Sequence, residues 1–329
     1  MADLREKVLA LKQHLESVIV GQDDLIKKML ITLLAGGHAL LEGAPGLAKT
    51  KAIKTLASSI KATFNRIQFT PDLLPSDITG SDIYLASTGA FEFRKGPVFA
   101  NLVLADEINR APAKVQSALL EAMGERQVSV GGKIYPLPDL FMVMATQNPI
   151  EHEGTYHLPE AQLDRFLMHI KIDQPDRFTE KKILKLVRRE DLASIKDKSG
   201  MAEHETNLEK ITVENVLAAS MEALQLYTSE EMEDYIVALI MATRQPQKYD
   251  ESLQNAVMFG ASPRATIALD KCAKINAWLE GREYVTPEDV HAVIFDVMRH
   301  RIVLSFEAMA EGLTPDDVIT KLLKVVPLP

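Results

Sequence analysis

A short stretch, GAPGLAKT at residues 43–50, constrains the fold of this chain more than any other feature. The apolar run HALLEG leads into it, and the segment KTKAIKTLASSI at its end has helical character. A strand, a loop and a helix in this order are the setting in which backbone N–H groups bind phosphate at a helix N-terminus. The order predicts an α/β fold in which a buried strand carries the loop to one edge of a sheet.

The stretch departs from the usual phosphate-loop pattern at one position. The pattern G-x-x-x-x-G-K-[ST] has glycine before the lysine, whereas this chain has Ala48. One methyl group is tolerated there if φ is negative and the methyl points away from the anion. In this interpretation Lys49 reaches the terminal phosphates and Thr50 binds Mg²⁺. The motif alone leaves open a lysine and a threonine in the first turn of a surface helix.

A second motif, NLVLADEINRAP, is an apolar strand that ends in Asp106 and Glu107. Phosphoryl-transfer enzymes use an acidic residue at the tip of a strand near the phosphate loop to hold Mg²⁺. A second carboxylate beside it can polarise the attacking water. The alternative is a strand that ends in solvent-facing acidic residues.

A third motif, MVMATQNP, is an apolar strand that ends in a polar residue, Asn148, before Pro149. An amide at this position can hold the nucleophilic water against the terminal phosphate. Asparagine before proline is also an ordinary way to begin a turn.

The rest of the chain divides into two parts. Apolar runs at 64–69, 101–106, 140–147 and 166–172 alternate in part with helical segments such as 111–125, which predicts a parallel sheet covered on both faces. Two helices precede the phosphate loop, the second over 23–34. Gly131-Gly132 predicts a β-hairpin, and 70–98 reads as an insertion. Helices are expected at about 178–196, 213–226, 229–244, 263–280 and 287–300, after a domain boundary near residue 175.

Composition excludes several classes of protein. The net charge of −9 makes a broad nucleic-acid-binding surface unfavourable. Cys272 is the only cysteine, so an internal disulfide is impossible, and we expect a cytoplasmic protein. The apolar runs are far shorter than the roughly 20 residues of a membrane-spanning helix. The histidines of HEGTYH (152–157) are five residues apart, which disfavours a helical zinc site.

Together these stretches resemble an AAA+ ATPase of the MoxR family. The resemblance rests on VIVGQ (18–22), GAPGLAKT, LVLADEINRAP, ATQNP, LPEAQLDRF (158–166) and GASPRA (260–265), and it spans about residues 15–300. The family commonly has alanine at the position of Ala48. It implies an α/β core over residues 1–175 and a smaller all-helical lid over 176–329. Segments 70–98 and 126–137 resemble two inserts that face the central pore of a ring.

The resemblance also implies a set of functional residues. Glu107 is the expected catalytic base, Asn148 matches sensor 1, Arg165 matches the arginine finger and Arg264 matches sensor 2. Thr50 and Asp106 are the expected Mg²⁺ ligands. The expected nucleotide-binding residues are Val20, Gly21, Gly43, Ala44, Pro45, Gly46, Leu47, Ala48, Lys49, Thr50 and Asp106.

Two of these arginines can be weighed without the family. Ser262 and Pro263 read as an N-cap and a first-turn proline, which puts Arg264 where the helix dipole disfavours a cation. An external anion would remove that conflict, although a solvated arginine remains an alternative. For Arg165 the alternative is a surface ion pair with Asp164, worth under about 1 kcal/mol.

The resemblance predicts an ATPase, with ATP and Mg²⁺ as ligands, that remodels a protein partner. It implies a homo-oligomer, expected to be a hexameric ring, and a partner such as a von Willebrand factor A domain protein. The alternative is a DNA-translocating, helicase-like AAA+ motor, against which the acidic composition weighs. A nucleotide-locked scaffold without turnover is a third possibility, which the set of Glu107, Asn148 and Arg165 disfavours.

Overall fold

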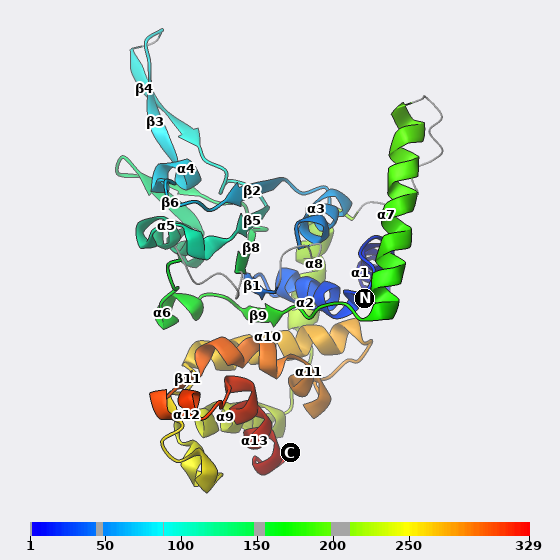
Figure 1. The fold of residues 1–329 in the computed structure, drawn as a ribbon, viewed down its shortest axis with the longest axis vertical. Coiled ribbons are helices and arrows are strands. Elements are labelled where there is room, and N and C mark those ends of the chain that lie inside the picture. The colour runs from blue at the N-terminus through cyan, green and yellow to red at the C-terminus, as the bar shows by residue number, and fades with distance from the viewer. Residues whose placement is uncertain (1, 44–48, 88, 148–154, 199–210) are drawn as a thin grey trace.

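A five-stranded parallel sheet lies at the centre of the computed structural model, which describes residues 2–43, 49–87, 89–147, 155–198 and 211–329 (Figure 1). The strand order is β2-β5-β8-β1-β9, and every neighbouring pair is parallel. The bounds are β1 Ala39–Glu42, β2 Phe64–Gln68, β5 Leu102–Asp106, β8 Met142–Gln147 and β9 Met168–Lys171. All five strands expected from the apolar runs are confirmed.

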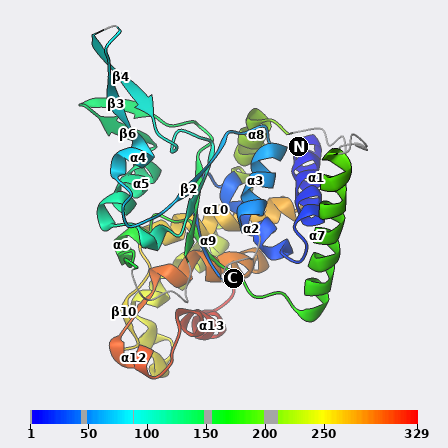
Figure 2. The same cartoon turned by 45° about the horizontal axis from the view of Figure 1, so that its top comes forward.

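The two faces of the sheet bury different sets of side chains because successive residues of a strand point to opposite sides. In β8, Met142 and Met144 belong to one hydrophobic cluster, whereas Val143 and Ala145 belong to another. Figure 2 shows α1, α2 and α3 on one side of the sheet and α4 and α5 on the other. Burial on both faces explains why the inner strands β1, β5 and β8 read as continuous apolar runs.

The helices follow the expected order along the chain. The two before the phosphate loop and the five after the sheet are confirmed, each within a few residues of the expected bounds. The helices are α1 Ala2–Val18, α2 Asp23–Leu34, α3 Lys49–Ser59, α4 Pro75–Thr79, α5 Ala113–Glu125, α6 Glu160–Leu163, α7 Arg177–Lys198, α8 Val213–Leu224, α9 Glu230–Arg244, α10 Pro263–Leu279, α11 Pro287–Met298, α12 Phe306–Ala310 and α13 Pro315–Val325. Short 3₁₀ turns lie at Ile108–Arg110, Pro246–Lys248, Glu251–Leu253 and Arg299–Arg301.

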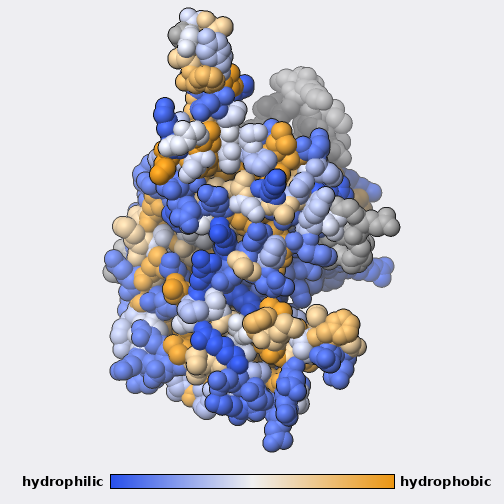
Figure 3. Space-filling model, turned by 90° about the vertical axis from the view of Figure 1, so that its left-hand side faces the viewer, coloured by the Kyte–Doolittle hydropathy of each residue, from blue (hydrophilic) through white to orange (hydrophobic). Residues whose placement is uncertain are grey.

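Two β-hairpins stand beside the sheet rather than in it. β6 Gln127–Val130 and β7 Lys133–Pro136 pair antiparallel, and Gly131 and Gly132 both have positive φ, as the expected turn requires. The segment 70–98 forms α4 and a second hairpin, β3 Gly80–Leu85 with β4 Ala90–Lys95. This second hairpin projects above the molecule (Figures 1 and 3).

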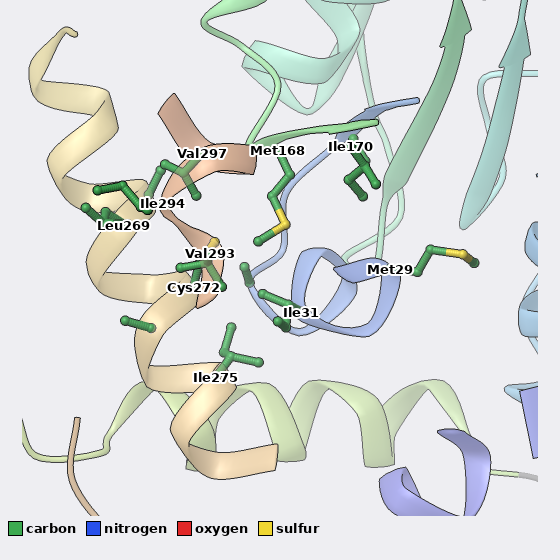
Figure 4. Packing of buried hydrophobic residues seen from close by; sticks show 14 of the residues in the cluster. Met29, Ile31, Met168, Ile170, Leu269, Cys272, Ile275, Val293, Ile294 and Val297 are labelled. Atoms are coloured by element: carbon green, nitrogen blue, oxygen red, sulfur yellow. The ribbon is translucent and has the colours of Figure 1, made fainter. Parts of the chain in front are cut away.

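The C-terminal helices share a hydrophobic core with one face of the sheet. Figure 4 shows Leu269 and Cys272 of α10 and Val293 of α11 close to Met168 of β9 and Ile31 of α2. Cys272 is fully buried, and burial raises the pKa of its thiol to about 12. The thiol is therefore part of the packing.

A short antiparallel pair, β10 Val257–Phe259 and β11 Val303–Leu304, completes this region. The boundary predicted near residue 175 falls between β9 and α7.

No helix among the described residues is long and apolar enough to cross a membrane.

Candidate active site

Several predicted site residues meet at the edge where the parallel strands end. Gly43 directly follows β1, Asp106 is the last residue of β5, and the register pairs Glu42 with Gln147 and Gln68 with Asp106. The carboxyl ends of parallel strands are where ligands bind in open α/β sheets. Residues 44–48 of the predicted phosphate loop and Asn148 lie outside the described residues.

Lys49 begins α3 and turns back toward the loop. Its Nζ donates a 2.7 Å hydrogen bond to the carbonyl of Gly43. Burial lowers the pKa of Lys49, while the nearby carboxylates of Asp106, Glu107 and Glu42 oppose that shift. A half-buried ammonium beside acidic groups suits a ligand that carries several negative charges. Thr50 follows in the first turn of the same helix.

The Asp106 carboxylate is held from both neighbouring strands. Its Oδ1 accepts a 2.6 Å hydrogen bond from the hydroxyl of Thr146 on β8, and its Oδ2 accepts from Arg66 on β2 at 2.6 and 3.1 Å. Thr146 is 2% exposed, and its hydroxyl also accepts a 2.9 Å hydrogen bond from the Glu107 backbone N–H. Thr146 thus fixes the positions of both acidic residues.

Glu107 leaves the strand in a left-handed conformation, with φ of 56° and ψ of 50°. This region is uncommon for a residue other than glycine and is enriched at functional sites. The Glu107 carboxylate accepts a 2.8 Å hydrogen bond from the Gln68 side-chain amide and lies 3.2 Å from Nε of Arg110. The turn therefore places the second carboxylate beside the polar side chains of Gln68 and Arg110.

Three residues of this site were not predicted from the sequence. Thr146, Gln68 and Arg66 contact the acidic pair because β2 and β8 flank β5 in the sheet. A threonine inside the apolar run MVMATQ is the one local signal that could have pointed to Thr146. The other two contacts depend on strand order, which the sequence does not reveal.

The site suits a magnesium ion that binds together with phosphate. Mg²⁺ prefers oxygen ligands and is usually held by one or two protein groups, with substrate phosphates and water completing the shell. The hydroxyl of Thr50 and the carboxylate of Asp106 are donors of this kind. Among the described residues there is no group of three or more His, Cys, Asp or Glu side chains that could hold a metal by themselves. Residues 152–154 of HEGTYH lie outside that search.

Val20 and Gly21 form the turn between α1 and α2. Gly21 has a φ of 79°, and a Cβ added to it would lie 2.0 Å from Cγ2 of Thr179 in α7. Glycine is therefore required at this position on both conformational and steric grounds. The turn lies beside the start of α7, the helix that follows the sheet.

Arg165 and Arg264 lie at the opposite edge of the sheet, where the strands begin. Both line a pocket of about 300 Å³, together with Gly37 and His38, which directly precede β1. From His38 to Gly43 a strand of this length spans about 17 Å. The two arginines are therefore remote from the Lys49 end of their own subunit.

Arg165 does not form the ion pair with Asp164 that was considered as the alternative. Asp164 binds Nε of Arg301 at 2.8 Å and the hydroxyl of Ser262 at 2.9 Å, and it lies 3.8 Å from Arg264. Arg165 instead donates to the carbonyl of Leu120 in α5. The predicted N-cap is confirmed, because the Ser262 hydroxyl accepts a 3.2 Å hydrogen bond from the Arg264 backbone N–H.

Arg301 joins the C-terminal helices to this edge. Its side chain is 3% exposed, and its guanidinium also donates to the carbonyls of Phe166 at 2.6 Å and Leu167 at 3.1 Å. These residues lie directly after Arg165 in the chain. The 3₁₀ turn after α11 and the segment that carries Arg165 are therefore held together.

Comparison with known proteins agrees with this geometry. Residues 38–168 match the ATPase family associated with various cellular activities (AAA), and residues 251–322 match the AAA lid domain. The chain is 46% identical over 317 residues to Chaperone MoxR1 of Mycobacterium tuberculosis, covering 96% of this chain and 81% of that protein. It is 30% identical to Protein MoxR of Methylorubrum extorquens, covering 100% of this chain and 97% of the relative.

A solved structure leads to the same conclusion. The crystal structure of a proposed ATPase from Cytophaga hutchinsonii superposes with a TM-score of 0.88 at 44% identity, covering 100% of this chain and 96% of the other. The parallel sheet and the helical C-terminal region agree with the matches to the AAA domain and the AAA lid domain. This chain belongs to the MoxR family of AAA ATPases.

Proposed function

We propose that this ATPase hydrolyses MgATP where two copies of the chain meet, and that the cycle remodels a protein partner. The observation that carries the proposal is the separation of the two halves of the site. Lys49, Asp106 and Glu107 lie where the strands end, whereas Arg165 and Arg264 lie where they begin. Arg165 and Arg264 are too far from Lys49 to contact a nucleotide bound by the same chain. In this proposal both arginines therefore contact the nucleotide of a neighbouring copy.

We propose a role for each residue of the first half. The Lys49 ammonium holds the terminal phosphates, and Glu107 accepts a proton from the attacking water. Thr50 and Asp106 hold Mg²⁺, which when bound offsets the charge of the phosphates. Thr146 keeps Asp106 in place. Gly43 and residues 44–48 form the phosphate loop, Asn148 orients the water, and Val20 and Gly21 border the adenine.

The second half supplies positive charge across the interface. An arginine contributed by a neighbouring protein is worth roughly 10³–10⁵ in rate in GTPases. Such a gain requires a closed arrangement in which every subunit has a neighbour, and we take a hexameric ring as that arrangement. The location of the protein in the cytoplasm remains a prediction.

The partner-facing surface is proposed to be the pair of hairpins. Phe93 of β4 stacks on Tyr135 of β7 at a ring separation of 3.9 Å, which joins the two hairpins. Tyr84, Phe91 and Ile134 remain exposed, Phe91 at 72%. Exposed aromatic side chains on a projecting element suit the capture of a polypeptide. A relative is named a chaperone, and a von Willebrand factor A domain protein is the proposed partner.

The test is the dependence of ATPase activity on protein concentration. The specific activity of the wild type should rise with concentration. Arg165→Ala should lower it by at least about 10³-fold while nucleotide binding to the isolated subunit is kept. Lys49→Ala is the matched control, because it should abolish nucleotide binding itself. A wild-type specific activity that is equal at all concentrations would overturn the proposal.

A further inference from the structure

The pocket that holds Arg165 and Arg264 contains more positive charge than those two residues supply. Its lining includes five cations: Arg126, Arg165, Arg264, Lys271 and Arg301. Only two carboxylates, Glu125 and Asp164, face them. The formal excess is three positive charges on a chain whose net charge is −9. A concentration of one sign against the trend of the whole molecule attracts a ligand of the opposite sign.

One of the five cations is neutralised within the subunit, because Arg301 is buried against Asp164. Arg126 and Arg165 each donate a hydrogen bond to a neutral backbone carbonyl, that of Gly36 and that of Leu120, which does not balance their charge. Arg126, Arg165, Arg264 and Lys271, offset by Glu125 alone, therefore carry the net excess of three. Asp164 is 3.8 Å from Arg264, but its closer contacts are with Arg301 and Ser262.

Lys271 faces the pocket because of its position on α10. Arg264, Ala268 and Lys271 are spaced four and three residues apart, which places them along one face of the helix, and all three line the pocket. Leu269 and Cys272, one position further round the helix, pack into the core (Figure 4). Within the described residues, no ion pair joins a carboxylate to Lys271. By contrast, Lys274 on the next turn pairs with Asp270 at 3.1 Å.

Placing three like charges around one pocket costs free energy unless an anion enters. That anion comes from another molecule, because the phosphate end of the same subunit is about 17 Å away along the strands. Lysine binds phosphate as a compact point charge and complements the planar guanidinium groups of arginine. A triphosphate carries enough negative charge to match all three.

We propose that Lys271 is a third cation supplied in trans, and that it contacts the phosphates of the nucleotide bound by the neighbouring subunit. This inference rests on the proposed function, in which Arg165 and Arg264 act across the same interface. It assigns to Lys271 a contact with substrate rather than a role in folding.

The first test compares substitutions along α10. Lys271→Met should lower kcat about tenfold at protein concentrations that saturate assembly, with nucleotide binding by the isolated subunit unchanged. Lys271→Arg should stay within about threefold of the wild type because the charge is kept. Lys274→Met, on the same helix but outside the pocket, is the matched control and should have wild-type kcat. A wild-type kcat for Lys271→Met would overturn the proposal.

The second test mixes the inactive Glu107→Gln variant with the slower Lys271→Met variant. Glu107→Gln subunits lack the base but keep Lys271, whereas Lys271→Met subunits keep the base. If Lys271 acts in trans, an equal mixture regains up to about a quarter of the wild-type activity, since random pairing places the two intact halves together in that share of interfaces. A mixture that is no more active than the Lys271→Met protein alone would mean that Lys271 acts within its own subunit, and would overturn the proposal.

The two proposals fail in different ways. If Arg165→Ala lowers activity and complements Glu107→Gln while Lys271→Met is fully active, the interface is correct and Lys271 is not part of it. If Arg165→Ala has wild-type activity, the proposed function itself is wrong. If Lys271→Met prevents assembly in the absence of nucleotide, Lys271 contacts a protein group of the neighbour and the phosphate assignment is wrong.

Discussion

The hydroxyl of Thr146 lies between two consecutive acidic residues: it donates to Asp106 Oδ1 at 2.6 Å and accepts from the Glu107 backbone N–H at 2.9 Å. Thr146→Val keeps the shape of the side chain and removes both hydrogen bonds. Groups that orient a metal ligand typically contribute 10- to 100-fold in affinity or activity. We therefore expect a loss of about 10- to 100-fold in kcat/KM and a higher Mg²⁺ requirement.

The measurement is a magnesium titration of ATPase activity at fixed ATP. Thr146→Ser keeps the hydroxyl and should behave within a few-fold of the wild type. If Thr146→Val and Thr146→Ser are equally active, the hydroxyl does not position the carboxylates.

His38 makes the stability of the protein depend on pH. Burial lowers its pKa from 6.5 to about 4, with a smaller contribution from the charge of Arg126, against the opposing hydrogen bond to the Met123 carbonyl. The folded state therefore binds this proton less readily than the unfolded state. The favourable free energy is complete above pH 6.5 and decreases as the pH falls toward 4. The loss at pH 5 is about 2 kcal/mol.

Urea unfolding of the wild type and of His38→Gln at pH 7 and pH 5 checks this expectation. Glutamine does not titrate, so the variant should lose about 2 kcal/mol less than the wild type between the two pH values. The variant is expected to be less stable at pH 7, because Val143 loses the ring nitrogen that accepts its N–H at 3.0 Å. An equal drop in both proteins would exclude His38 as the cause.

Arg301→Met removes a buried guanidinium and leaves Asp164 without its 2.8 Å partner. Breaking a buried pair in this way costs about 3–5 kcal/mol. Trp278 is the only tryptophan and is 3% exposed within α10, so its fluorescence reports unfolding of the C-terminal helices. The midpoint in urea should fall markedly. Lys274→Met, which affects only a partly exposed pair on the same helix, is expected to change it by less than about 1 kcal/mol.

The stacked rings of Phe93 and Tyr135 should couple the two hairpins. Aromatic pairs of this kind contribute about 0.5–1.5 kcal/mol beyond the burial of their area. Hydrogen exchange of residues 80–95 in Phe93→Ala, Tyr135→Ala and the double variant gives the coupling free energy. Phe91→Ala, whose side chain is 72% exposed, is the control. Strictly additive effects of the two substitutions would mean that the hairpins open independently.

The sequence predicted those elements whose burial leaves a pattern. The inner strands β1, β5 and β8 are buried on both faces and read as apolar runs, and Gly131-Gly132 marks its hairpin. The β3–β4 hairpin was not expected, because most of its residues are exposed, although the alternation of Phe91, Glu92 and Phe93 could have indicated a strand. α13 was also missed, although Thr314, Pro315 and Asp317 form a capping box with a first-turn proline that could have revealed it.

The site divides in the same way. Asp106 and Glu107 were predicted because they end a strand, and the strands bring them beside Lys49. The contact between Gln68 and Glu107 needed the order β2-β5-β8, which is a property of long-range pairing rather than of any local pattern. Lys271 has no local signal, because it lines a pocket only together with residues distant in the chain, such as those at the end of α5 and at 36–38.

The attachment of Arg301 to the backbone of Phe166 and Leu167 couples the C-terminal helices to the segment that carries Arg165, the arginine proposed to act on a neighbouring copy. A tilt of those helices would also displace the backbone next to Arg165, because Arg301 is hydrogen-bonded directly to it. In a closed assembly, a movement of the C-terminal helices in one subunit would then determine when ATP is hydrolysed in the neighbouring subunit. The order in which the subunits hydrolyse ATP would then follow from this connection within the fold.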